Sequence, residues 1–145
     1  MWQVTASDLS ADALVLAKDN AKLNRVDISF VLADVFENVS GCFDIIVSNP
    51  PYISENDKDE VGLNVLTSEP KMALFADEDG LAIYRQILED ADKYLNPQGK
   101  LYFEIGYKQG EDLRKLLSLH FPDKHVRVLK DQFGQDRMVV MDDGN

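Results

Sequence analysis

The sequence predicts an α/β domain with a mainly parallel sheet and helices on both faces. Short runs of β-branched and aromatic residues alternate with segments in which apolar residues recur every three or four positions, which is the spacing of a helix. The chain has 145 residues, of which 45% are hydrophobic, and this is enough for one ordinary domain with a sizeable core. We therefore expect residues 1–145 to form a single α/β domain.

The first third of the chain contains three expected strands and one helix. Residues 2–7 predict a short strand, and the apolar spacing that follows predicts a helix with Ser10 as its N-cap. Residues 28–32 and 43–47 are two more β-branched and aromatic runs. The second of them is continuous enough to indicate a strand covered on both faces.

The middle and the end of the chain continue the alternation. Residues 54–79 have no clean period, and we expect a solvated lid or linker there. From Gly80 the spacing predicts a helix that ends at Asn96-Pro97-Gln98-Gly99. The last elements are a strand at 101–105, a helix that ends before Pro122, and an antiparallel hairpin with arms at 125–129 and 138–141 around Phe133-Gly134-Gln135.

Charge and cysteine content argue against several classes of function. The formal net charge is -11, from 26 acidic and 15 basic residues, and such a surface repels a phosphate backbone. We expect no direct nucleic-acid partner. Cys42 is the single cysteine and stands in no metal-ligand cluster, and no apolar run approaches the roughly 18 residues that cross a bilayer. We therefore expect a cytoplasmic protein with no metal site and no membrane partner.

One motif carries the chemistry. Asn49-Pro50-Pro51-Tyr52 follows the expected strand at 43–47, and its prolines fix the backbone and remove two N–H donors. An NH₂ group can donate one hydrogen to the side-chain oxygen of Asn49 and the other to the carbonyl of Pro50, while Tyr52 packs on its face. Two such acceptors favour positive charge on a feebly nucleophilic nitrogen and orient it for methyl transfer. The alternative is an ordinary loop between elements.

Asn49-Pro50-Pro51-Tyr52 resembles the signature of amino methyltransferases of the Rossmann-like class I fold. On its own it is shared with DNA adenine and ribosomal RNA guanine methyltransferases, which stay an alternative. Residues 69–74, 79–85 and 131–137 resemble the release-factor glutamine methyltransferase family, which methylates N5 of a glutamine in a Gly-Gly-Gln loop. The resemblance implies S-adenosyl-L-methionine as the cofactor and a peptide-chain release factor as the protein substrate.

The resemblance also implies roles for individual residues. The catalytic group would be Asn49, Pro50, Pro51 and Tyr52. Asp8 would accept hydrogen bonds from the ribose hydroxyls of the cofactor, and Asp34 and Val35 would lie beside its adenine, with Asn49 shared between cofactor and substrate. An alternative for Asp8 is a structural acid at the entry of the following helix.

The family's glycine-rich cofactor loop, its first strand and its helical N-terminal domain are expected ahead of residue 2, and this sequence does not contain them. We therefore expect a truncated catalytic domain that is inactive alone. A non-catalytic remnant that binds a partner is the alternative from another class. The absent strand would lie between the strands at 2–7 and 43–47, so we expect exposed edges and self-association by strand exchange. Direct pairing of those strands and frayed edges are the other outcomes.

Overall fold

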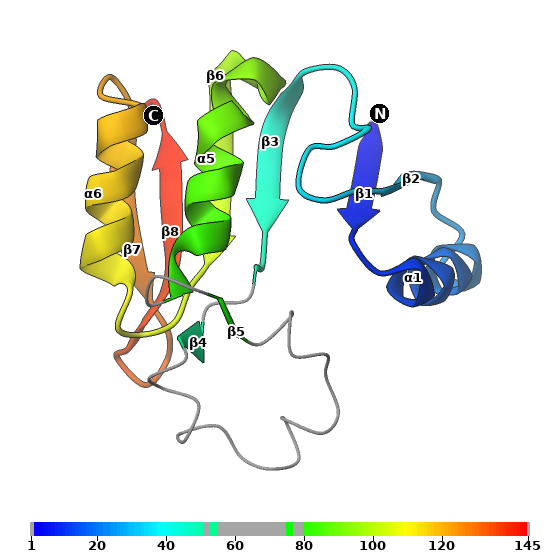
Figure 1. Ribbon diagram of the computed structural model, residues 1–145, viewed down its shortest axis with the longest axis horizontal. Coiled ribbons are helices and arrows are strands. Elements are labelled where there is room, and N and C mark those ends of the chain that lie inside the picture. The colour runs from blue at the N-terminus through cyan, green and yellow to red at the C-terminus, as the bar shows by residue number, and fades with distance from the viewer. Residues whose placement is uncertain (1, 51–52, 55–74, 77–79, 145) are drawn as a thin grey trace. The chain divides into compact units, whose positions relative to one another are not determined.

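The computed structural model describes residues 2–50, 53–54, 75–76 and 80–144. The chain divides into two compact units, Met1–Gly41 and Cys42–Asn145, and each is described by itself. Figure 1 shows the helices and strands of both units.

The first unit is a strand, a helix and a second strand parallel to the first. Its elements are β1 (Val4–Asp8), α1 (Ala11–Leu23) and β2 (Ile28–Leu32). β1 and β2 pair in parallel, with Asp8 opposite Leu32. The hydroxyl of Ser10 accepts a hydrogen bond from the N–H of Ala13 at 3.2 Å, which confirms the predicted N-cap. The first strand begins two residues later than expected, at Val4.

The second unit contains a four-stranded sheet in the order β3-β6-β8-β7, and a two-stranded parallel sheet of β4 and β5. β3 is parallel to β6, whereas β8 is antiparallel to both β6 and β7, so the predicted C-terminal hairpin is confirmed. The bounds of the elements are β3 Phe43–Ser48, β4 Ile53–Ser54, β5 Phe75–Ala76, α5 Ala82–Tyr94, β6 Leu95–Glu104, α6 Gly110–His120, β7 His125–Lys130 and β8 Asp136–Asp142. The expected lid at 54–79 lies almost entirely outside the described residues.

Most of the core of the second unit lies between α5, α6 and one face of the four-stranded sheet. α5 and α6 contact each other on this face, as Figure 1 shows. The rings of Tyr84 and Phe103 meet edge to face with centroids 5.1 Å apart. The hydroxyl of Tyr84 also donates to the carbonyl oxygen of Glu104 at 2.7 Å. This buried tyrosine therefore fastens α5 to the carboxyl end of β6.

The other face of this sheet differs from expectation at β3. Side chains alternate between faces along a strand, so Ile45 and Val47 lie on the face opposite the helices. Ile45 is 36% exposed and Val47 is 74% exposed. The prediction that this strand is covered on both faces is therefore wrong for the described part of the chain, because α5 and α6, the helices described in this unit, pack on one face.

The stop predicted after α5 is part of a strand. The helix ends at Tyr94, but residues 96–99 belong to β6, whose register against β3 shifts between the pairs Phe43–Leu95 and Ile45–Lys100. The side chain of Lys124 fixes this irregular segment, because its ammonium group donates to the carbonyls of Pro97 at 2.7 Å and Gly99 at 3.3 Å.

β1 and β3 are edge strands of their own sheets. An edge strand presents backbone groups that can pair with another strand. Strand exchange with a second copy therefore stays a prediction.

None of the helices in the described residues is long and apolar enough to cross a membrane.

Tyr84→Phe should destabilise the second unit by about 1–2 kcal/mol, because the carbonyl of Glu104 loses its donor while the ring packing is kept. Urea denaturation followed by circular dichroism measures this change. The matched control is Tyr102→Phe, which removes a hydroxyl from a half-buried side chain on the opposite face of β6. Equal stability of the two variants would contradict a structural role for the Tyr84 hydroxyl.

Candidate functional site

The candidate substrate site lies at the carboxyl ends of the parallel strands β3 and β6. Ser48, the last residue of β3, pairs with Phe103 near the end of β6. Asn49 follows directly and is exposed, whereas Pro50 is buried. The protein therefore anchors the backbone after β3 while it presents the amide of Asn49 to solvent. Ligands of parallel α/β sheets bind at this edge.

Asn49 and Pro50 carry the hydrogen-bonding groups that the predicted substrate site needs. The side chain of Asn49 offers one carbonyl acceptor and two N–H donors, and Pro50 offers a carbonyl acceptor without a competing N–H. Pro51 and Tyr52, the other two predicted catalytic residues, lie outside the described residues. Roles for all four stay predictions.

A tight turn between β6 and α6 borders this site. The side-chain oxygen of Gln109 accepts from the N–H of Gly106 at 3.0 Å, and the N–H of Gln109 donates to the carbonyl of Gly106 at 3.0 Å. Gln109 is only 6% exposed, so this reciprocal pair is held inside the protein. Gln109 is not among the residues predicted from the sequence, although a glutamine three residues after a glycine can close a turn in this way.

The β7–β8 turn lies at the same end of the sheet, because the N–H of Ile105 donates to the carbonyl of Arg137 at 2.9 Å just beyond the last residue of β6. One carboxylate oxygen of Asp131 accepts from the N–H groups of Phe133 at 2.8 Å and Gln135 at 3.1 Å. The other accepts from two nitrogens of Arg137, each at 3.3 Å. Asp131 thus closes the turn.

Two glycines allow the β7–β8 turn and the close approach of α6 to it. Gly134 adopts a φ of +79°, a left-handed conformation that glycine takes without a steric cost. A Cβ atom at Gly110, the first residue of α6, would collide with the carboxylate of Asp136 and come within 3.2 Å of Val128. The absence of a side chain at Gly110 therefore lets α6 begin directly against the hairpin.

Two of the predicted cofactor residues meet at the carboxyl end of the small sheet in the first unit. Asp8 ends β1, and its carbonyl accepts from the N–H of Ala33 at 3.0 Å, which places Asp34 one residue further along the same edge. Both acids are exposed. The carboxylate of Asp8 accepts from the N–H of Ser10 at 2.8 Å. The alternative structural role of Asp8, at the entry of α1, therefore has direct geometric support, and its role toward a cofactor stays a prediction.

Val35, the third predicted cofactor residue, has an unusual backbone. It is half-buried and adopts a φ of +59°. A β-branched residue rarely adopts this left-handed conformation, which costs of order 1–3 kcal/mol. The surrounding structure must therefore fix the chain direction immediately after Asp34.

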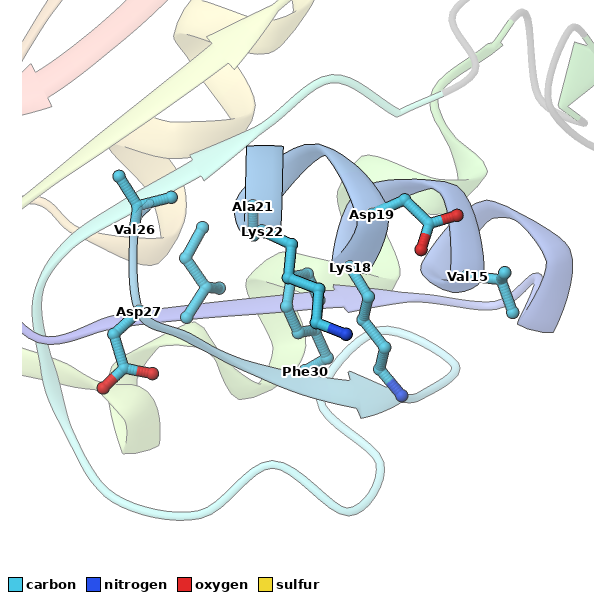
Figure 2. Close-up of a pocket in the computed structure, with 9 residues that line it drawn as sticks. Val15, Lys18, Asp19, Ala21, Lys22, Val26, Asp27 and Phe30 are labelled. Carbon is cyan, nitrogen blue, oxygen red and sulfur yellow. The ribbon is translucent and has the colours of Figure 1, made fainter. Parts of the chain in front are cut away.

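An open pocket of about 430 Å³ in the first unit is a different feature. Figure 2 shows it between α1 and β2. It is lined by Val15, Lys18, Asp19, Ala21, Lys22, Val26, Asp27, Ile28 and Phe30. Neither Asp8 nor Asp34 is among them, so this pocket is separate from the edge where the predicted cofactor residues lie. Ligands of parallel sheets bind beyond the carboxyl ends of the strands, so the strand ends, and not this pocket, indicate where a cofactor would bind.

Solved structures show that this fold is that of class I methyltransferases. A methyltransferase from Pyrococcus furiosus matches 99% of this chain over 64% of its own length, with a TM-score of 0.66 and 21% identity. The Thermus thermophilus 16S rRNA N2 G1207 methyltransferase, in complex with AdoMet and guanosine, matches 97% of this chain over 31% of its own length, with a TM-score of 0.63 and 17% identity. At these identities the likeness concerns the fold alone.

Residues 1–77 match the family model of the methyltransferase small domain, and the chain belongs to this family. It is 62% identical to the release factor glutamine methyltransferase of Streptococcus pneumoniae, over 99% of this chain and 51% of that protein. It is 46% identical to that of Lactococcus lactis, over 95% of this chain and 51% of that protein. The chain thus spans about half the length of these curated relatives. The resemblance that the motifs indicated is confirmed.

The carboxyl of Asp131 should titrate below its ordinary pKa. The N–H of Gln135 is the largest cause of this lowered pKa, and the Phe133 N–H and the Arg137 guanidinium add to it. The carboxylate therefore stabilises the turn above the unfolded pKa of about 3.9, and this stability is lost as pH falls through the lower folded pKa. A carboxyl NMR titration measures the midpoint.

Arg137→Gln should raise the pKa of Asp131 only part of the way toward its ordinary value, because the two backbone N–H donors remain. Arg114→Gln is the matched control, since Arg114 binds Glu111 and should leave the Asp131 midpoint unchanged. An Asp131 that titrates at its ordinary pKa in the unchanged protein would refute the closed turn.

Proposed function

We propose that the full-length protein containing this chain transfers a methyl group from S-adenosyl-L-methionine to the side-chain amide nitrogen of a glutamine in a peptide-chain release factor. One observation carries the proposal: Asn49-Pro50 stands at the carboxyl end of β3 in a chain that is 62% identical to a release factor glutamine methyltransferase. The same proposal includes a location in the cytosol. Cys42 forms no disulfide, and thiols stay reduced in that compartment.

The residues of the first unit fit the cofactor. A ribose diol needs paired acceptors, and the exposed carboxylate of Asp8 supplies oxygens that are oriented by its bond to the Ser10 N–H. Asp34, on the same strand edge, offers a second carboxylate for the exocyclic amine of the adenine, with Val35 next to it. When bound, S-adenosyl-L-methionine supplies an electrophilic methyl group on a positively charged sulfur.

The residues after β3 orient the glutamine and favour its nitrogen as the nucleophile. We assign the side-chain oxygen of Asn49 and the carbonyl of Pro50 as acceptors for the two hydrogens of the substrate NH₂ group. Acceptors on both hydrogens draw positive charge onto a nitrogen whose lone pair is otherwise delocalised into the amide carbonyl. The ring of the buried Pro50 restricts the backbone, which favours these acceptors being in place before substrate arrives. Tyr52 would pack on the planar amide face.

The protein substrate is favoured over a nucleic acid by charge. DNA adenine and ribosomal RNA guanine methyltransferases use the same four-residue signature, but a net charge of -11 opposes binding of a polyanion. A non-catalytic binding remnant accounts less well for the presence of the complete Asn-Pro-Pro-Tyr motif.

The deciding assay incubates the full-length protein with labelled S-adenosyl-L-methionine and a purified release factor. Label should appear on one glutamine of the release factor, and mass spectrometry of the digested product locates it. A release factor with this glutamine replaced by alanine serves as the control and should stay unlabelled. Transfer only to DNA or RNA would overturn the assignment, and no transfer to any of the three would support the remnant.

Asn49→Ala in the full-length protein should lower kcat by about 100- to 1,000-fold, because one preorganised acceptor for the transferring nitrogen is lost, worth roughly 2.7–4 kcal/mol. Steady-state kinetics measure kcat, and calorimetry with S-adenosylhomocysteine measures cofactor binding, which should weaken much less. Asn20→Ala, at an exposed position of α1, is the control and should retain activity. Unchanged turnover would remove Asn49 from the chemistry.

A further inference from the structure

Two aromatic side chains of the second unit are exposed. Tyr107 is 43% exposed and Phe133 is 80% exposed. The other aromatic side chains of this unit whose exposure the structure describes are buried or half-buried, and they are Phe43, Tyr84, Tyr94, Tyr102, Phe103 and Phe121. An isolated exposed apolar residue is ordinary, but two exposed aromatics at one end of a sheet form a pattern that needs an explanation.

Both exposed aromatics lie at the end of the sheet where β3 delivers Asn49. Tyr107 is in the turn between β6 and α6, and Phe133 is in the turn between β7 and β8. The pairs Ser48–Phe103 and Glu104–Met138 align the ends of β3 and β6 with the start of β8. In Figure 1 the turn between β7 and β8 is at the lower end of the sheet, toward which the β3 arrow points.

The backbone that carries each aromatic is fixed in advance. The reciprocal hydrogen bonds of Gln109 and Gly106 close the first turn, and Tyr107 lies between these two residues. Asp131 closes the second turn by accepting from the N–H of Phe133 itself. Because the backbone is ordered before a partner arrives, contact with a partner loses little further backbone entropy. A rigid, exposed aromatic is the type of residue that dominates protein interfaces.

The position and the charge favour a polypeptide as the partner. Aromatic side chains also stack on single-stranded bases, but nucleic-acid sites combine such stacking with a positively charged groove. The net charge of the chain is -11. Asn49 lies at the same end of the sheet as both turns, so the turns are in position to contact residues that flank a glutamine bound at Asn49.

We propose that Tyr107 and Phe133 form an aromatic contact surface that binds the segments of the release factor on either side of the target glutamine. This inference rests on the proposed function and deepens it. Asn49 and Pro50 would select the amide group, whereas the aromatic contact surface would select the protein that carries it.

The test uses the full-length protein with Phe133→Ala, Tyr107→Ala and the double variant. Each single variant should raise KM for the release factor about tenfold, which corresponds to the loss of one well-placed interface side chain. The kcat and the KM for S-adenosyl-L-methionine should stay within twofold of the unchanged protein. Phe133→Trp should keep the low KM, because an aromatic contact is retained. Unchanged thermal midpoints establish that the variants are folded.

Leu119→Ala is the matched control, because Leu119 is 77% exposed near the end of α6, at the opposite end of the sheet. It should not change KM for the release factor. If the double variant and Leu119→Ala behave alike while the unchanged protein methylates the release factor, the aromatic contact surface is refuted and the proposed function stands. If the unchanged protein methylates only an RNA or DNA oligomer, the proposed function fails and the polypeptide partner fails with it.

Discussion

The pairing of β6 with β3 on one side and β8 on the other is the constraint on which the candidate substrate site depends. β6 supplies the buried residues Leu101 and Phe103 and is parallel to one neighbour and antiparallel to the other. The carboxyl end of β3 and the amino end of β8 must then lie at the same end of the sheet. The bond from the Tyr84 hydroxyl to the Glu104 carbonyl fixes this end to α5. The position of Asn49 therefore depends on hydrophobic packing between residues that are distant in the sequence.

Elements whose signals are local could be predicted from the sequence. The strand at 28–32 has the predicted bounds, and Ser10 caps α1 as expected, because an N-cap needs only its neighbours along the chain. The start of β6 could not be predicted, since Asn96-Pro97-Gln98-Gly99 has strong turn chemistry. Its place in the strand depends on β3 and on Lys124, both remote in sequence. The exposure of Val47 was missed for a similar reason, because hydrophobicity indicates a preference for burial and does not identify what covers a strand.

In the candidate site, too, local features could be predicted from the sequence and features that depend on the folded path could not. The position of Asn49 at a strand end followed from the sequence. The adjacency of Asp8 and Asp34 did not, because it depends on the parallel pairing of β1 with β2, which the structure shows. The bonds of Asp131 could not be derived, since they depend on the exact path of the turn through Gly134. The left-handed conformation of Val35 also lacks a sequence signal, because valine disfavours it.

Gly110 has a consequence for how substrate preference can change during evolution. Because Gly110 has no side chain, α6 begins close to the carboxylate of Asp136, and closely packed parts of a protein transmit displacements to each other. Residues in contact often show non-additive mutational effects, so replacements in the two turns are expected to depend on each other. Recognition of a new protein would then require coordinated replacements in both turns, so an intermediate with only one replacement would lose the old partner before it gained the new one.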